Sequence, residues 1–226
     1  MKLFLTSTGL ENRSISHHFK MNFLPENASF LVVAIKDPKQ DAFYLEKTLN
    51  EIRETGAQDI DVFELGSEKF NAKKDYNIVF VCGGNTFDYL NRIRRAKVDK
   101  FLINFSKKEN TTYVGVSAGS ILAGPNIEVA KLCKEQNNMN LQNLKGLHLT
   151  DYIIFPHYKK ELKADLDAFK RQTEFPVIEL EDDQAFVSDG AIFYYINKDL
   201  YPVIIQHKAL TEKGLSAIII SIIKYN

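Results

Sequence analysis

Continuous apolar runs that alternate with amphipathic stretches restrict the fold of this chain more than any other feature of its sequence. Phe30–Ile35 and Ile78–Cys82 consist almost entirely of aliphatic, β-branched and aromatic residues, which is typical of strands buried on both faces. Asp41–Thr55 and Thr86–Lys97 instead read as helices. Because helices have to cover both faces of such a sheet, the alternation predicts a three-layer α/β sandwich with a mostly parallel central sheet.

The remaining elements follow the same reading. Further strands are predicted at Leu3–Leu5, Ile60–Glu64, Thr112–Val116 and Ile153–Phe155, and further helices at Val98–Lys108 and Lys160–Gln172. Val177–Glu179, Gln184–Ser188 and Ile192–Ile196 are short and close together, which predicts antiparallel strands at a sheet edge. We find no repeat and no linker, so residues 1–226 are interpreted as a single domain.

Composition excludes several classes of protein. Hydrophobic residues make up 45% of the 226 residues and charged residues 26%, which is typical of a globular chain. The 29 basic residues balance the 29 acidic ones, so we expect neither nucleic acid nor a membrane as a partner, while a homodimer stays open. With two cysteines, Cys82 and Cys133, a disulfide framework is excluded. We expect a cytoplasmic protein with no cofactor and no metal.

The segment Gly115–Gly119 reads Gly-Val-Ser-Ala-Gly and comes directly at the end of a predicted strand. A Gly-x-Ser-x-Gly turn between strand and helix projects the serine hydroxyl from the carboxyl edge of the sheet. The N–H of Ala118, at the start of the next helix, would point to where an oxyanion forms. Ser117 is therefore the candidate nucleophile, and the alternative is a glycine-rich turn without chemistry.

A second glycine turn, Cys82–Asn85, follows another buried strand and should lie at the same edge of the sheet. The Gly84 N–H is a candidate for the second oxyanion donor, and Asn85 for a substrate-binding residue. The alternative is a bare turn in which Asn85 or Thr86 caps the following helix.

A serine hydroxyl needs a base to take its proton. His157 stands just after a predicted strand and Pro156, at a position from which its ring can reach Ser117. The carboxylate that orients the imidazole would come from Glu181, Asp182 or Asp183, which follow another predicted strand. The spacing of these residues does not choose among the three.

Three segments in this order, Val81–Phe87, Gly115–Ser120 and Phe155–Tyr158, resemble the peptidase E and cyanophycinase family of serine peptidases over about residues 1–196. The resemblance implies a fold like the class I glutamine amidotransferases, which is flavodoxin-like, with serine in place of their cysteine. It assigns the nucleophile to Ser117 and the base to His157.

The same resemblance places the oxyanion donors on the backbone of Gly84 and Ala118. It places the third triad member two residues past Leu180, which selects Asp182. Peptidase E has glutamate there, so Glu181 and Asp183 stay open as alternatives.

Other departures concern the substrate. Where the aspartyl dipeptidase branch has an arginine after its histidine, this chain has Lys159–Glu161, and Arg171 lies in a predicted helix. Leu132 occupies the place of a further acid of that branch. The resemblance therefore does not carry Asp-X specificity to this chain, and the tail 201–226 matches nothing in the family.

The leading hypothesis is a serine peptidase that hydrolyses a short peptide or isopeptide bond through an acyl-enzyme. An α/β-hydrolase esterase is the alternative enzyme, because Ser117, Asp182 and His207 follow its order of serine, acid and histidine. A non-catalytic binding protein on the same fold is the third hypothesis.

Overall fold

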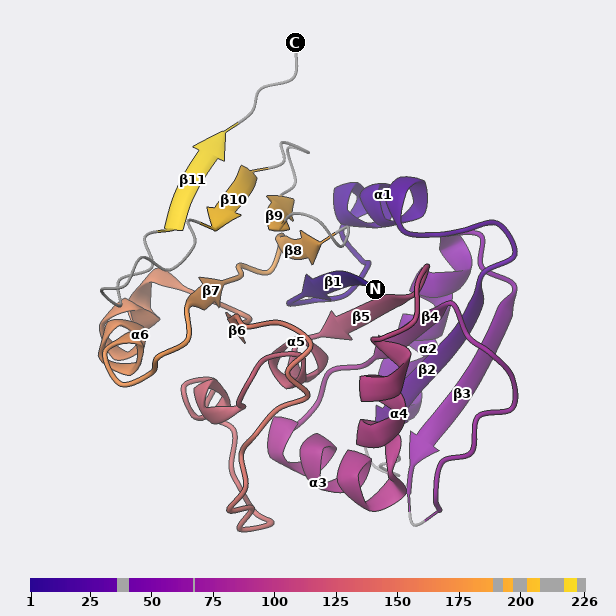
Figure 1. The fold of residues 1–226 in the computed structure, drawn as a ribbon, viewed down its shortest axis with the longest axis horizontal. Coiled ribbons are helices and arrows are strands. Elements are labelled where there is room, and N and C mark those ends of the chain that lie inside the picture. The colour runs from indigo at the N-terminus through magenta and orange to yellow at the C-terminus, as the bar shows by residue number, and fades with distance from the viewer. Residues whose placement is uncertain (36–40, 67, 189–192, 197–202, 208–217, 223–226) are drawn as a thin grey trace.

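The structure is a computed structural model that describes residues 1–35, 41–66, 68–188, 193–196, 203–207 and 218–222. In this part of the chain, nine strands form one sheet in the order β11-β10-β9-β8-β1-β5-β4-β2-β3 (Figure 1). The strands are β1 (Lys2–Thr6), β2 (Ser29–Ile35), β3 (Asp59–Leu65), β4 (Ile78–Val81), β5 (Thr112–Val116), β8 (Ala185–Ser188), β9 (Phe193–Ile196), β10 (Val203–His207) and β11 (Ile218–Ile222).

The sheet has a parallel half and an antiparallel half. Strands β1, β5, β4, β2 and β3 are parallel, whereas β8 to β11 add to the edge at β1 in antiparallel pairs. All four residues of β4 are completely buried, as expected for a strand covered on both faces. The predicted α/β fold with a mostly parallel core is confirmed.

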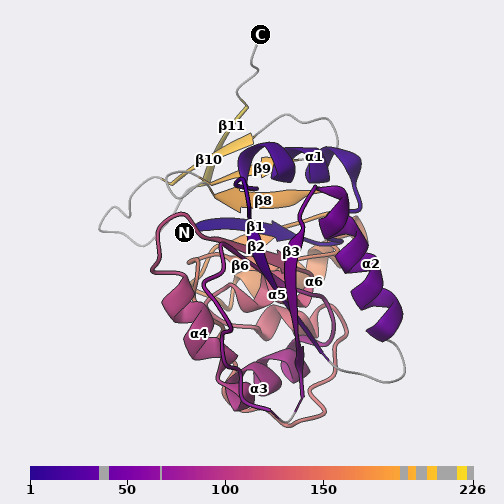
Figure 2. The ribbon, with the colours of Figure 1, turned by 90° about the vertical axis from the view of Figure 1, so that its right-hand side faces the viewer.

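Helices cover both faces of the parallel half. Those that do so are α1 (Arg13–Asn22), α2 (Asp41–Glu54), α3 (Thr86–Ala96), α4 (Val98–Phe105) and α5 (Ala118–Leu122). Helix α6 (Lys163–Lys170) lies outside this half, and short 3-10 turns are found at Glu128–Lys131 and Lys160–Leu162. Figures 1 and 2 show α1 and α2 on one side of the sheet and α3, α4 and α5 on the other. Right-handed crossovers explain this division, because the chain moves outward through β2 and β3 and then returns through β4 to β5.

Helix α1 is an element that the sequence analysis did not predict. It buries only Ile15 and Phe19, four residues apart, so its apolar stripe is narrow. The Asn12 side chain begins the helix by accepting hydrogen bonds from the N–H groups of Ser14 and Ile15. Because the cap and most of the helix consist of polar residues, a search for apolar periodicity does not detect α1.

One prediction about the second half of the chain is corrected. Val177–Glu179 is not an antiparallel edge strand of the main sheet: it is β7, and it pairs in parallel with β6 (Ile153–Phe155) in a separate two-stranded sheet. Helix α6 connects them, as a parallel pair requires. Within the tail that matched nothing, residues 203–207 and 218–222 pair as β10 and β11 and extend the main sheet. None of the helices in the described ranges is long and apolar enough to cross a membrane.

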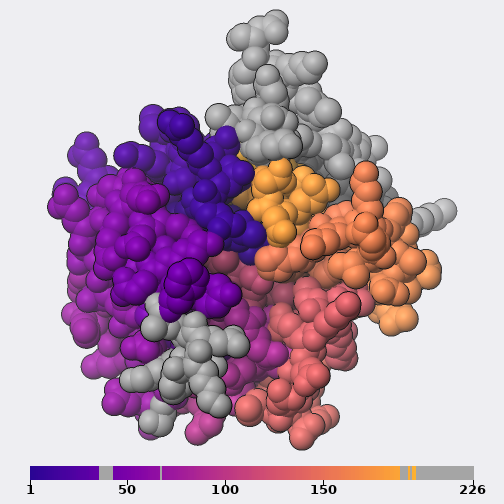
Figure 3. Space-filling view, turned by 180° about the vertical axis from the view of Figure 1, so that it is seen from behind, coloured from indigo at the N-terminus to yellow at the C-terminus, as the bar shows by residue number. Residues whose placement is uncertain are grey.

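The sheet register brings three turns to one edge. Gly115 in β5 lies opposite Leu5 in β1 and Val81 in β4, so the residues that follow all three strands leave the sheet at the same level. Seen from behind, the N-terminal segment, the region of α2 and the chain beyond residue 150 meet on this face of the molecule (Figure 3). Parallel strands bind ligands at this carboxyl edge.

Helix α5 approaches the sheet so closely that Gly119 cannot carry a side chain: a Cβ there would lie 2.2 Å from the carbonyl oxygen of Val81. Alanine normally stabilises a helix by about 1 kcal/mol relative to glycine, but here the clash outweighs that gain. We expect Gly119→Ala to lower the free energy of unfolding by about 1–3 kcal/mol or more, measured by urea denaturation. Gly66→Ala is the control, because among the described residues the nearest atom to its Cβ would be the Glu64 carbonyl oxygen, at 3.9 Å. A Gly119→Ala protein as stable as the wild type would contradict this packing.

Candidate active site

Ser117 occupies a strained turn between β5 and α5. Its backbone has φ 49° and ψ −107°, a combination that a non-glycine residue rarely adopts. The Ser117 N–H donates to the Thr6 carbonyl at 2.9 Å, which ties the turn to the end of β1. The hydroxyl of Ser120 lies 2.7 Å from the carbonyl oxygens of both Thr6 and Gly115 and holds the first turn of α5 against the sheet. Packing around the turn thus maintains the strain.

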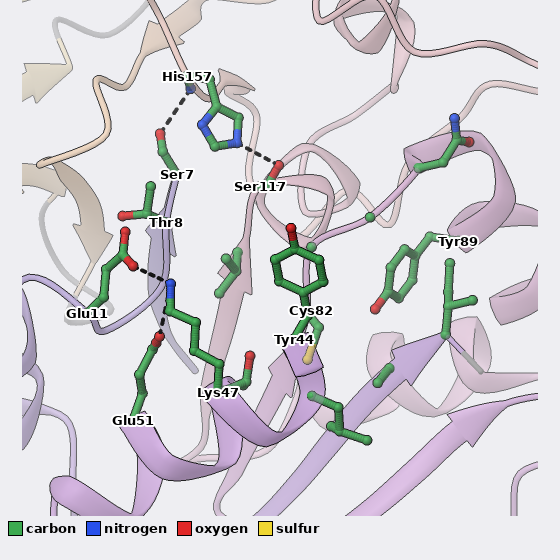
Figure 4. A pocket seen from close by; sticks show the side chains of 18 of the residues that line it. Ser7, Thr8, Glu11, Tyr44, Lys47, Glu51, Cys82, Tyr89, Ser117 and His157 are labelled. Carbon is green, nitrogen blue, oxygen red and sulfur yellow. Dashed lines mark hydrogen bonds and ion pairs between the residues drawn. The ribbon is translucent and has the colours of Figure 1, made fainter. Parts of the chain in front are cut away.

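His157 contacts Ser117 directly. Its Nε2 lies 2.9 Å from Ser117 Oγ, and its Nδ1 lies 2.6 Å from Asp182 Oδ1 (Figure 4 draws the Ser117 contact). When Nδ1 carries the proton that Asp182 accepts, Nε2 has its lone pair free for the hydroxyl hydrogen of Ser117. The three side chains therefore form one hydrogen-bonded chain from alcohol to imidazole to carboxylate.

Two polar residues that directly follow β1 position His157 and Asp182. Ser7 accepts a hydrogen bond from the His157 N–H at 3.1 Å and donates to the Leu180 carbonyl at 3.0 Å. Thr8 donates to the backbone carbonyl of Asp182 at 2.8 Å. The sequence analysis missed both residues. Their position in the sequence could have indicated this role, because they directly follow a strand whose carboxyl end faces the site.

Of the three candidate acids, the structure brings only Asp182 to His157. The Glu181 N–H donates to Gln184 Oε1 at 3.0 Å, which turns this loop. Glu181 and Asp183 instead line a second, open cavity beside the Asp182 carboxylate.

The other sequence candidates lie elsewhere. His207 belongs to β10, four strands from β5 in the sheet order, and its side chain lies outside what the structure describes. Arg171 directly follows α6 and Leu132 follows a 3-10 turn, and neither lines the cavity at Ser117. Lys159 and Lys160 line the second cavity.

Two backbone N–H groups are the candidate oxyanion donors. Ala118 is the first residue of α5 and is completely buried. Gly84 has φ +149°, which favours glycine, and a Cβ on Gly83 would lie 3.3 Å from the Ser117 Cβ. The Cys82–Asn85 turn therefore packs directly against Ser117. The side chain of Asn85 caps α3 by accepting from the Asp88 N–H at 2.9 Å, and Asn85 also lines the cavity.

A cavity of about 490 Å³ opens beside Ser117 and His157. Its other end carries an ion-pair network in which Lys47 on α2 contacts Glu11 and lies 3.9 Å from Glu51 (Figure 4). Burial raises the pKa of the Glu51 carboxyl, although a hydrogen bond from the Leu10 N–H and the charge of Lys47 oppose the shift. The side chain of Tyr44, which is 62% exposed as a residue, also lines the cavity.

Among the described residues, no group of three or more histidine, cysteine, aspartate or glutamate side chains is placed to hold a metal ion. Neither Cys82 nor Cys133 forms a disulfide. Burial raises the pKa of the Cys133 thiol to about 12, so this thiol stays protonated at neutral pH.

Comparison with known proteins identifies relatives of this chain. An uncharacterized peptidase of Listeria monocytogenes is 27% identical over 161 residues, which cover 69% of this chain and 77% of that protein. One of Pasteurella multocida is also 27% identical, over 70% of this chain and 77% of its own length. A crystal structure of a candidate peptidase E protein from Listeria monocytogenes superposes with a TM-score of 0.68 at 20% identity, covering 87% of this chain and 98% of the other.

The solved structure shows the fold that the resemblance implied, that of the class I glutamine amidotransferases. The profile of Peptidase family S51 matches residues 3–195, which include all three turns of the site. The resemblance inferred from the three sequence segments is confirmed: the chain belongs to Peptidase family S51, the serine peptidases that include peptidase E.

Proposed function

We propose that this serine-type peptidase cleaves a short peptide or isopeptide bond with Ser117 as nucleophile, His157 as general base and Asp182 as the acid that orients the imidazole. The observation that carries the proposal is the unbroken chain of contacts from Ser117 Oγ to His157 to Asp182 at the edge of a cavity. An isolated serine or histidine would not support the chemistry, because a neutral hydroxyl is a weak nucleophile.

Acylation follows from the contacts. As Ser117 Oγ forms a bond to the carbonyl carbon of the substrate, its proton passes to His157 Nε2, and the carbonyl oxygen becomes an oxyanion. The N–H groups of Gly84 and Ala118 stabilise that charge. The protonated imidazole then gives its proton to the leaving nitrogen as the C–N bond breaks, and Asp182 stabilises the imidazolium in between.

Deacylation repeats these steps with water. His157, neutral again, takes a proton from a water molecule whose oxygen attacks the acyl carbon. The ester bond to Ser117 breaks, and the proton returns to Ser117 Oγ as the carboxylic acid product leaves. Apart from this water molecule, both halves of the reaction use only groups of the chain that have already been named.

The cavity bears on the size and charge of the substrate. A volume of about 490 Å³ lies in the range of small-molecule sites, which supports a short peptide. No arginine is among the described residues that line it, so the bidentate partner that an aspartyl side chain would favour is missing there. We therefore do not extend Asp-X dipeptidase specificity to this chain.

Because neither cysteine is paired, the cytoplasm is the compartment we propose.

The nucleophile can be tested without knowing the substrate. A fluorophosphonate probe should phosphonylate Ser117 in the wild type and leave Ser117→Ala unlabelled, because the probe needs an activated serine. Mass spectrometry of the labelled peptide identifies the site. Ser106→Ala, outside the cavity, is the control and should be labelled like the wild type. Absence of label on wild-type Ser117 would refute the proposed function.

The third triad member is tested by three amide substitutions. Asp182→Asn should lower the second-order labelling rate on the order of 10³–10⁴-fold, because an amide no longer holds the imidazole in the useful tautomer. Glu181→Gln and Asp183→Asn remove the same charge from neighbouring positions and should stay within about threefold of the wild type, since surface charges contribute little. A larger effect at either neighbour would reassign the acid.

The base is tested against the esterase alternative. His157→Ala should abolish labelling within detection, and His207→Ala should retain it, because His157 Nε2 lies 2.9 Å from Ser117 Oγ, whereas His207 belongs to β10, four strands from β5. Labelling rates of the two purified proteins, checked for folding by circular dichroism, give the answer. The opposite pattern would favour the esterase order of serine, acid and histidine.

A further inference from the structure

Glu135 is distant in sequence from the Cys82–Asn85 turn, which carries the candidate oxyanion donor Gly84, but it binds the residue that directly follows this turn. Its Oε2 accepts a hydrogen bond from the Thr86 N–H, and its Oε1 accepts one from the Thr86 hydroxyl at 2.9 Å. Thr86 is completely buried and is the first residue of α3, directly after the Cys82–Asn85 turn. A first-turn N–H has no partner within its own helix, so Glu135 supplies it.

The next residue makes a second contact to the same turn. The backbone carbonyl of Gln136 accepts a hydrogen bond from Asn85 Nδ2 at 3.1 Å. Residues 135 and 136 thus bind two consecutive residues, Asn85 and Thr86, immediately after Gly84. Since the orientation of the Gly84 N–H depends on the peptide planes around it, these contacts restrict where that donor points.

The segment that carries Glu135 is connected to the other oxyanion donor. Helix α5 begins at Ala118, and the chain runs from it through the 3-10 turn Glu128–Lys131 to Glu135. The Glu135 N–H donates to the Ala130 carbonyl at 3.3 Å, which attaches the residue to that turn. The hydrogen bonds of residues 135 and 136 therefore connect the Cys82–Asn85 turn, which bears Gly84, to the segment of chain that follows Ala118.

The surroundings of Glu135 fit a fixed carboxylate near the site. Burial raises the pKa of the Glu135 carboxyl, while the two hydrogen bonds from Thr86 and the charge of a protonated His157 lower it. Glu135 is nevertheless absent from the residues that line the cavity at Ser117, so a role through Thr86 fits better than contact with substrate.

We propose that Glu135 is a positioning residue that holds the Gly84 N–H in the direction needed for the oxyanion. This inference rests on the proposed function, because it assumes that Gly84 stabilises charge at Ser117. Removal of Glu135 leaves the Thr86 N–H without an acceptor and releases the turn, so the loss falls on the reaction step and not on ligand binding. Small displacements of a reacting geometry can cost up to about 100-fold in rate.

The test uses the saturation kinetics of fluorophosphonate labelling, in which Ser117 Oγ bonds to phosphorus, fluoride leaves and the phosphoryl oxygen occupies the oxyanion site. Glu135→Ala should lower the maximal labelling rate about 10-fold or more and leave the half-saturating probe concentration within about threefold. Glu135→Gln should restore most of the rate, because its amide oxygen can accept from the Thr86 N–H and its NH₂ can donate to the Thr86 hydroxyl. Glu128→Ala, an exposed carboxylate on the preceding turn, is the matched control and should behave like the wild type.

Each outcome decides the matter. An unchanged maximal rate in Glu135→Ala, or a Glu135→Gln protein as slow as the alanine variant, overturns the positioning role while a labelled wild type leaves the proposed function standing. An unlabelled wild type refutes the proposed function, and this inference with it. If Glu135→Ala does not fold, Glu135→Asp replaces it: the shorter side chain cannot bring both oxygens to Thr86, and its maximal rate should fall about threefold or more.

Discussion

The close approach of helix α5 to the sheet is the constraint on which the site depends. A Cβ on Gly115 would lie 2.6 Å from the Gly119 carbonyl oxygen, and one on Gly119 would meet the end of β4. Only glycine at both positions lets the chain turn from β5 into α5 within one residue, and that turn forces Ser117 to φ 49°. The strained backbone points the hydroxyl out of the sheet edge. The shape of the turn, more than any property of the serine, thus brings the hydroxyl to His157.

The remaining two side chains reach Ser117 through backbone hydrogen bonds. The Tyr158 N–H donates to the Leu180 carbonyl, and the Leu180 N–H donates to the Phe155 carbonyl, each at 2.9 Å, so the loops that bear His157 and Asp182 extend the pairing of β6 with β7. Ser7 then binds both loops at the end of β1. A rigid frame of main-chain contacts therefore sets the distance between imidazole and carboxylate, which side-chain packing alone would leave loose.

Features of the fold and of the site could be predicted from the sequence where they depend on residues that are close together in the chain. The buried strands and the Gly115–Gly119 turn were visible, because apolar runs and paired glycines act on their own neighbours. The choice of Asp182 over Glu181 and Asp183 needed a family resemblance, since three adjacent carboxylates differ only in the direction they face. The Thr86–Glu135 contact had no sequence signal, because it joins residues 49 positions apart that match no motif.

Exposure of the site to water weakens the electrostatic interactions among its side chains before a substrate binds. The side chains of His157 and Asp182 are 42% and 54% exposed, respectively, so water screens the attraction between them and the pair stabilises the fold very little. Their short contact therefore serves to orient the imidazole. A peptide that fills the cavity removes water from the side of Ser117, and charges that water had screened then interact more strongly. In the proposed mechanism, the interactions of the triad are accordingly strongest with substrate bound. An exposed aspartate can then orient the imidazole without the free-energy cost of burying its charge when the chain folds.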